Sequence, residues 1–303
     1  MPTWDPDIVI DLDRTHSIVV DQFPSFAGLK AEFLGQGWDN YCIRYEDGTI
    51  FRLPTRAMGG QLIIREIAML PYLHGQVSLP IPNLLYVGNA TQDYPYQFIG
   101  YPELLGITSD RLEWNAPERQ VVAKKLGKFL AGLHRVPITD EARQILPSGA
   151  VGLDWLRERL EFRYQWVQKH LPERKQWADE LYELVHRLVD GLSVEDEMVI
   201  CHSDLYPRHV LANESFEITG VIDWGDVQIA HPATDLSLAF TFLEEGERTD
   251  FWLGYGRDVS QETKRFAQLK AILYALSLVA YGLDVNDVDI TRLGDLIAAR
   301  NMA

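Results

Sequence analysis

One stretch of this 303-residue chain decides its fold: residues 201–212 read CHSDLYPRHVLA. In this stretch a polar cluster that contains Asp204 and His209 stands between two short apolar runs. Such a pattern predicts a loop that leaves one strand and enters another, where a rigid scaffold exposes functional groups. A second stretch, IDWGD at residues 222–226, also follows a strand-like run. The two strand ends therefore bring Asp204, His209 and Asp223 within reach of one another.

Asp204, His209 and Asp223 are the side chains that phosphoryl transfer requires. An enzyme that moves a phosphoryl group must orient a hydroxyl nucleophile and hold divalent cations against the β- and γ-phosphates of a nucleotide. In this hypothesis Asp204 orients the acceptor hydroxyl and takes its proton, while His209 and Asp223 bind Mg²⁺. Each short motif is weak by itself, because His-x-Asp is common by chance. The order and spacing of the motifs together favour the hypothesis.

Residues 1–100 have the chemistry of a small β-rich lobe. They contain several short β-rich runs, and Asp47-Gly48 between two of these runs predicts a hairpin. Within residues 62–73 the apolar side chains recur at helical spacing, which predicts a single helix among the strands.

The pattern becomes helical beyond residue 107. Asn115 and Pro117 supply a helix start before an apolar stripe that runs to Leu133. Further helices are expected over residues 152–170, 173–192 and 262–283. Pro102 and Gly106 punctuate the connection between the two parts. The predicted fold class is therefore α+β, with an N-terminal lobe over residues 1–100, a hinge over 101–106 and a larger helical lobe over 107–303.

Composition and charge exclude several classes of protein. The chain is 47% hydrophobic and 24% charged, which is typical of folded globular proteins. It has 28 basic and 44 acidic residues, a net charge of −16, and this charge repels nucleic-acid phosphates and anionic lipid. We therefore expect no nucleic-acid and no membrane partner.

Cysteine use and the N-terminus favour a cytoplasmic protein. Cys42 and Cys201 are far apart in the chain and have no metal-ligand spacing, which fits a reducing compartment. The start of the chain lacks the basic segment of a secretory signal. The longest apolar stretch, residues 271–283, is shorter than the roughly 18 residues of a membrane span, and we expect it to be a buried helix.

The motifs resemble those of the aminoglycoside phosphotransferase family. The catalytic loop of that family reads His-x-Asp with a metal ligand five residues after the Asp, as in residues 202–209. Its second metal motif is similar to residues 222–226, which are followed by Pro-x-x-Asp at 232–235. The resemblance implies the two-lobed protein-kinase-like fold.

The resemblance extends over roughly residues 30–245. Residues 34–40 are similar to the nucleotide loop of the family, 98–101 to the strand that enters its hinge, and 126–134 to its central helix.

The resemblance implies a role for each matching residue. Asp204 would be catalytic, and His209 and Asp223 would bind Mg²⁺, with Mn²⁺ as an alternative. Structural roles are implied for His202, Asp226 and Asp235. Nucleotide contacts are implied for Gly35, Gly37, Arg52, Glu66, Tyr101, Glu103 and Leu104.

Two residues depart from the general kinase pattern. Residues 31–123 contain no lysine, and Arg52 occupies the position of the phosphate-binding lysine, with Glu66 as its expected partner. A guanidinium keeps the charge and binds phosphate bidentately. His209 stands where kinases have Asn, and imidazole suits transition metals better than Mg²⁺. The aminoglycoside 2''- and macrolide 2'-phosphotransferase subgroups resemble this chain in carrying His there.

The acceptor is expected to bind to the helical lobe. Glu244 and Glu245 lie close to Trp252 in the sequence, and carboxylates with aromatic faces suit a polyamino sugar. The predicted function is transfer of the γ-phosphoryl group of ATP or GTP to a hydroxyl of an aminoglycoside-like acceptor. The alternatives are a macrolide or metabolite-alcohol kinase, or a catalytically inactive nucleotide-binding member. We expect a monomer or a weak dimer.

Overall fold

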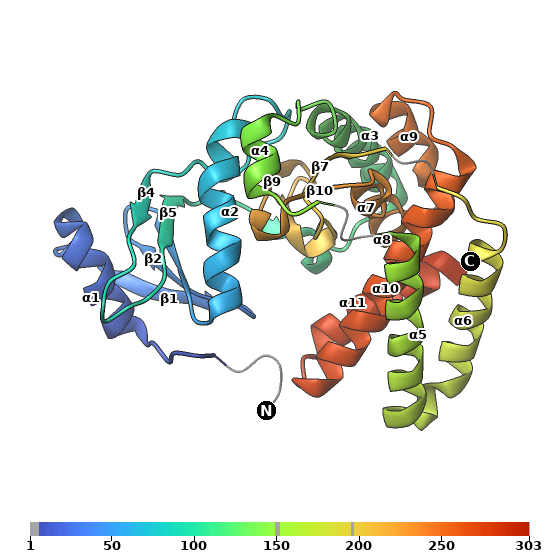
Figure 1. Ribbon diagram of the computed structural model, residues 1–303, viewed down its shortest axis with the longest axis horizontal. Coiled ribbons are helices and arrows are strands. Elements are labelled where there is room, and N and C mark those ends of the chain that lie inside the picture. The colour runs from blue at the N-terminus through green and yellow to red at the C-terminus, as the bar shows by residue number, and fades with distance from the viewer. Residues whose placement is uncertain (1–5, 149–151, 195–196, 303) are drawn as a thin grey trace.

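A five-stranded antiparallel sheet with helices on both faces builds the N-terminal lobe of the computed structural model (Figure 1). The structure describes residues 6–148, 152–194 and 197–302. The strands, in the sheet order β1-β2-β3-β5-β4, are β1 (Ala31–Gln36), β2 (Asn40–Tyr45), β3 (Thr49–Pro54), β5 (Phe98–Pro102) and β4 (Tyr86–Gly88).

Alternation along β3 assigns its side chains to two different cores. Phe51 and Leu53 pack under α1 (Leu12–Gln22) and the short helix after it, while Ile50 faces α2 (Ala57–Leu73). Since successive side chains of a strand point to opposite faces, Arg52 lies on the same face as Ile50. The sheet therefore directs Arg52 toward α2 and the second lobe.

The predicted Asp47-Gly48 hairpin joins β2 and β3. Gly48 has a φ of +81°, a left-handed conformation that favours glycine, and the Asp47 carboxylate accepts a hydrogen bond of 2.9 Å from the Thr49 amide.

The C-terminal lobe is helical, and its helices surround two small sheets. Asn115 caps α3 with a reciprocal capping box to Glu118, as its position in the sequence predicts. The small sheets have the orders β10-β7 and β6-β8-β9. The helices are α3 (Ala116–Leu133), α4 (Asp140–Ile145), α5 (Leu153–His170), α6 (Lys175–Val189), α7 (Ala233–Leu236), α8 (Leu238–Phe242), α9 (Arg248–Tyr255), α10 (Gln261–Asp284) and α11 (Val288–Met302). The strands are β6 (Ile107–Thr108), β7 (Val199–Cys201), β8 (Val210–Ala212), β9 (Ile218–Val221) and β10 (Gln228–Ala230).

The longest helix, α10, packs against α5 and α11 (Figure 1). By length and composition alone α10 could cross a membrane, but 67% of its most apolar window is buried inside the protein. The apolar stretch 271–283 is therefore part of the core of the lobe, as its sequence predicts.

The predicted two-lobed α+β architecture is confirmed, with some differences in element boundaries. The helix expected over residues 173–192 ends at Val189, and Gly191 has the left-handed φ of +61° that is common after helices. The helices α1 and α11 were not predicted.

Close packing of α3 against α9 generates a test of the fold. A Cβ atom added at Gly127 would lie 2.1 Å from the carbonyl oxygen of Phe251, so the backbones would have to separate. We expect Gly127→Ala to lower the free energy of unfolding by about 2 kcal/mol or more, measured by urea denaturation. Gly132→Ala, on the same helix, is the control, since its nearest neighbour would be at an ordinary 3.6 Å. That control should change stability by less than about 1 kcal/mol, and equal effects of the two would contradict the packing.

Candidate active site

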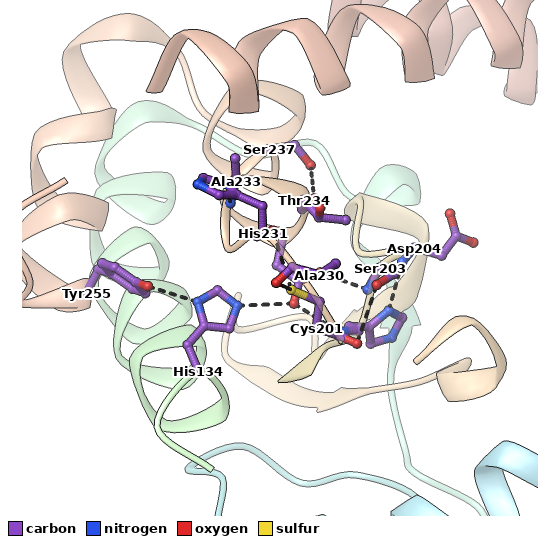
Figure 2. A network of polar contacts seen from close by, with 12 residues as sticks. His134, Cys201, Ser203, Asp204, Ala230, His231, Ala233, Thr234, Ser237 and Tyr255 are labelled. Carbon is purple, nitrogen blue, oxygen red and sulfur yellow. Dashed lines mark hydrogen bonds and ion pairs between the residues drawn. The ribbon is translucent and has the colours of Figure 1, made fainter. Parts of the chain in front are cut away.

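A buried carboxylate, that of Asp235, holds the loop after β7 in place. Asp235 accepts hydrogen bonds of 2.8 Å from the His202 amide through Oδ2 and from the Ser203 amide through Oδ1. These bonds hold Ser203 in a left-handed conformation with a φ of +73°, which is strained for a residue other than glycine. The turn exposes the next residue, and Figure 2 shows the carboxylate of Asp204 pointing away from this buried network.

Asp235 is in turn fixed by a pair of buried side chains on the helical lobe. His134 Nε2 lies 3.3 Å from Asp235 Oδ2, and His134 Nδ1 lies 2.9 Å from the Tyr255 hydroxyl (Figure 2). The Cys201 thiol donates to the carbonyls of Ala230 and His231. Ligand atoms of His134, Cys201 and Asp235 lie within 4.8 Å of one another. Because hydrogen bonds already satisfy these atoms, the cluster is a support for the loop.

His202, for which a structural role is predicted, links the two polar loops. Its Nε2 donates to the Ile222 carbonyl at 2.9 Å, and its Nδ1 accepts from the Asp204 amide at 3.3 Å. Burial lowers the pKa of His202, and these two hydrogen bonds require the neutral ring. The backbones before Asp223 and at Asp204 are therefore tied to each other.

His209 and Asp223 face each other in a geometry that fits a cation. His209 Nδ1 donates to the Asp204 carbonyl oxygen at 2.6 Å, which leaves a lone pair on Nε2 in the neutral ring. This Nε2 lies 3.4 Å from Asp223 Oδ2. Two acceptors at that distance need a proton or a metal ion between them. Imidazole and carboxylate donors suit Mn²⁺, and the carboxylate also suits Mg²⁺.

Arg52 joins the two lobes at this point. Its Nη1 donates to both oxygens of Glu66, at 2.9 and 3.0 Å, and its Nη2 donates to Asp223 Oδ1 at 2.9 Å. The predicted Arg52–Glu66 pair is therefore present, and Glu66 is fully buried. Burial acts to raise the pKa of Asp223, but the charge of Arg52 and its hydrogen bond to the carboxylate act in the opposite direction, and that pKa is about 2.

The two oxygens of Asp204 face different surroundings. Oδ2 lies 3.5 Å from His209 Nδ1, and Oδ1 accepts a hydrogen bond of 3.0 Å from the Tyr274 hydroxyl. Tyr274 belongs to α10 and stacks on Tyr206 at 5.3 Å between ring centroids. Sequence reasoning missed Tyr274, because the one signal is a hydroxyl-bearing ring within an apolar helix, and such residues are usually core.

Asp226, for which a structural role is predicted, lies at the surface near Asp204 and Asp223. The structure records no hydrogen bond of its side chain to a described residue, and the residue is exposed. Loss of hydration and then the charges of Asp204 and Asp223 raise the pKa of Asp226 to about 7. Asp226 is therefore a third carboxylate close to Asp204 and Asp223.

The residues predicted to contact nucleotide lie along the N-terminal lobe. Gly35 and Gly37 are at the end of β1 and in the turn to β2, where an added Cβ would meet open space. Tyr101 is buried on the α2 face of the sheet. Glu103 donates its amide to the Gly48 carbonyl, and its carboxylate pairs with Arg44 at 3.1 Å. The Glu103 amide therefore already donates its hydrogen bond within the protein and is not available to a nucleotide.

At Leu104 the side chain packs against Gly220 of β9. The segment that connects the lobes is thus fixed to the small sheet that also carries the catalytic loop.

The recorded contacts of the three residues predicted to bind the acceptor are with residues outside the Asp204 loop. Glu244 pairs with Arg300 at 3.0 Å, and the ring centroid of Trp252 lies 5.2 Å from Lys264 Nζ. Glu245 is exposed. In the part of the chain that the structure describes, no recorded hydrogen bond, ion pair or ring contact joins these residues to Asp204.

Comparison with known proteins agrees with this geometry. Residues 30–269 match the phosphotransferase enzyme family, abbreviated APH. An aminoglycoside 3'-phosphotransferase of Streptomyces fradiae is 30% identical over 155 residues, which are 47% of this chain and 51% of that protein. The chain therefore spans about half the length of this curated relative.

Two solved structures show the same fold over almost the whole chain. The GDP and kanamycin complex of APH(2'')-IIIa is 24% identical with a TM-score of 0.72, and the match covers 96% of this chain and 98% of that one. Macrolide 2'-phosphotransferase type I is 20% identical with a TM-score of 0.63, and the match covers 95% and 97%.

The buried Arg52–Glu66 pair generates a test of the site. We expect Arg52→Met to lower the free energy of unfolding by about 3 kcal/mol or more, because Glu66 would lose its partner in a buried position. Arg44→Met is the matched control, since Arg44 forms its ion pairs on the same sheet with a side chain that is 38% exposed. The control should cost less than about 1 kcal/mol in denaturant titrations. Adding Glu66→Leu to Arg52→Met should recover part of the loss, and an Arg52→Met protein as stable as the control would contradict the pairing.

Proposed function

Because the chain belongs to the phosphotransferase enzyme family, we propose that it is a small-molecule kinase that transfers the γ-phosphoryl group of ATP or GTP to a hydroxyl group. The family resemblance drawn from the catalytic-loop motif is confirmed by the match over residues 30–269. The observation that carries the proposed activity is the position of Asp204, which is half-buried beside the facing pair His209 and Asp223.

The donor side of the site consists of Arg52, His209 and Asp223. His209 and Asp223 would hold Mg²⁺ or Mn²⁺, which neutralises charge on the phosphates when it is bound. Arg52 Nη1 is engaged by Glu66 and Nη2 by Asp223, so its guanidinium is fixed in direction before any nucleotide binds. A fixed guanidinium is suited to binding phosphate oxygens. Arg52 would in this way supply the positive charge of the absent lysine.

Asp204 would act on the acceptor hydroxyl. A carboxylate beside a hydroxyl orients it and accepts its proton as the new P–O bond forms. Phosphoryl transfer by this route is direct and in line, and the enzyme contributes position and charge neutralisation. The Tyr274 hydroxyl, bonded to Oδ1, fixes the rotation of the carboxylate and leaves Oδ2 on the His209 side.

The retained carboxylates weigh against a catalytically inactive member. Asp204, Asp223 and Asp226 lie close enough for their charges to raise the pKa of Asp226. Such repulsion costs stability unless a cation offsets it, and a chain with no catalytic use for these groups would be more stable without them.

The named relatives define the first acceptors to test. The curated relative is an aminoglycoside 3'-phosphotransferase, one structural relative is bound to GDP and kanamycin, and another is a macrolide 2'-phosphotransferase. We therefore propose aminoglycosides first and macrolides second, with either purine nucleotide as donor. We also propose a cytoplasmic enzyme that acts as a monomer or weak dimer, in keeping with the free thiols of Cys42 and Cys201.

Release of nucleoside diphosphate tests the proposal. ATP and GTP are each assayed with Mg²⁺ and with Mn²⁺, against aminoglycosides, macrolides and no acceptor. We expect an acceptor to stimulate release, and Asp204→Asn to reduce turnover roughly 10²-fold or more with nucleotide affinity nearly unchanged. Asp258→Asn is the control, because this exposed carboxylate lies outside the site. Full activity of Asp204→Asn would contradict the proposal that Asp204 orients the acceptor hydroxyl and accepts its proton.

A further inference from the structure

An aromatic contact joins the two lobes at the tip of the predicted nucleotide loop. Trp38 lies in the turn between β1 and β2, and its ring centroid is 4.3 Å from that of Tyr281 on α10. The Trp38 side chain also hydrogen-bonds to Tyr281. Since the indole Nε1–H is a donor only, the Tyr281 hydroxyl is the acceptor. Because β1 and α10 belong to different lobes (Figure 1), this contact combines ring packing with a directed hydrogen bond between the lobes.

The neighbouring residue, Asp39, fastens the same turn to the N-terminal lobe. Its carbonyl oxygen accepts hydrogen bonds from the Thr55 amide at 2.7 Å and from the Thr55 hydroxyl at 3.2 Å. Its carboxylate pairs with Arg56, which directly precedes α2. The packing here is close, because a Cβ atom added at Gly59 would lie 2.7 Å from the Asp39 carbonyl oxygen. The two residues at the tip of the turn are thus held by different lobes.

The register of the sheet places this turn beside the donor side of the site. Gly35 of β1 lies opposite Cys42 of β2, which lies opposite Arg52 of β3. Neighbouring strands are about 4.8 Å apart, so Gly35 is about 10 Å from Arg52 across the sheet. Arg52 is hydrogen-bonded to Asp223, one of the two proposed metal ligands. The segment from Gly35 to Trp38 is therefore placed to cover the phosphates of a nucleotide that binds there.

The helix that receives Trp38 also holds the proposed catalytic carboxylate. Tyr281 follows Tyr274 by seven residues on α10, which is about two helical turns, so the two side chains lie on one face of the helix. The Tyr274 hydroxyl donates to Asp204 Oδ1 at 3.0 Å. Through this one helix, the tip of the nucleotide loop is fixed relative to the residue proposed to act on the acceptor.

The loop depends on such anchors, because its glycines restrain it little. A Cβ atom added at Gly35 or at Gly37 would have no atom of the described residues within 4 Å, and glycine has more conformational freedom than any other residue. β1 fixes one end of the loop, and Asp39 fixes the turn to the N-terminal lobe. The contact of Trp38 with Tyr281 sets the distance from the loop to the C-terminal lobe.

We propose that Trp38 is a positioning residue: its contact with Tyr281 holds the nucleotide loop over the donor phosphates, at the distance that the metal site of the C-terminal lobe requires. This inference rests on the proposed kinase function. Trp38 acts on the nucleotide through the loop. Loss of the contact lets the loop move away from the phosphates, and the measured affinity then falls with the fraction of molecules whose loop is in place.

Nucleotide affinity and turnover, measured on the same variants, test this role of Trp38. Dissociation constants of non-hydrolysable ATP and GTP analogues are measured by titration calorimetry with Mg²⁺. We expect Trp38→Leu and Tyr281→Leu each to weaken binding of the preferred analogue about tenfold, since each removes one aromatic contact and one hydrogen bond. Turnover at saturating nucleotide should change less than about twofold, because only the placement of the nucleotide is affected. Asp204→Asn is expected to show the opposite pattern.

A double variant assigns the effect to the contact between the two rings. Trp38→Leu combined with Tyr281→Leu should also weaken binding about tenfold, because both changes remove the same interaction. Phe33→Leu is the matched control, since Phe33 is an exposed aromatic residue of β1 that contacts Tyr41 on the α1 face of the sheet, away from the site. It should leave both dissociation constants unchanged.

Thermal melting shows whether each variant is folded. Tyr281→Phe keeps the ring and removes only the hydroxyl, so it provides a variant that leaves the packing of α10 intact. We expect it to weaken nucleotide binding about threefold, as loss of the hydrogen bond alone provides.

The outcomes separate this inference from the kinase proposal. An affinity of Trp38→Leu equal to that of the wild type overturns the inference, and so does a loss of about a hundredfold in the double variant, which would show that the two residues act independently. Either result, together with Asp204-dependent transfer by the wild type, leaves the kinase proposal standing. Coupled losses of affinity without transfer to any acceptor would support the role of Trp38 and contradict the kinase proposal. A wild-type protein that binds neither analogue at millimolar concentration would overturn both.

Discussion

The site depends on one buried guanidinium that two carboxylates share. Arg52 reaches from β3 to Glu66 on α2 and to Asp223 in the loop after β9, so a single side chain fixes three segments and both lobes. Asp204 and Asp226 add further negative charge nearby, which one guanidinium does not neutralise. We propose that a triphosphate approaches such a site together with a multivalent cation, which the lone pair of His209 Nε2 and the facing Asp223 would hold.

Below this site, the protein stabilises a strained loop with buried hydrogen bonds. Asp235 accepts from two consecutive amides, and His134 and Tyr255 hold Asp235 in place. The energy of that network keeps Ser203 in its left-handed conformation and so fixes the exit direction of Asp204. The loop that carries Asp204 is therefore held in one conformation by buried hydrogen bonds.

Much of the fold and of the donor half could be predicted from the sequence, for physical reasons that are local. The capping residue Asn115, the Asp47-Gly48 turn and the spacing from Asp204 to His209 act within a few residues of the chain. The partnership of Arg52 with Glu66 followed from the resemblance to the family, in which the position of Arg52 is that of the phosphate-binding lysine. Tyr274 could not be found in this way, since its position beside Asp204 depends on how α10 packs after folding. The electrostatic environment of Asp226 could not be predicted either, because motif position does not reveal which carboxylates find hydrogen-bond donors.

The location of a bound divalent ion is the most direct test of the account. Crystals of the protein with Mn²⁺ and a non-hydrolysable nucleotide are measured at a wavelength that gives anomalous scattering from manganese. The account predicts an anomalous peak in ligand contact with His209 Nε2 and an Asp223 oxygen, with Arg52 beside the phosphates. A manganese peak bound by Asp204 and Asp226 alone, or a bound nucleotide whose metal contacts neither His209 nor Asp223, would contradict it.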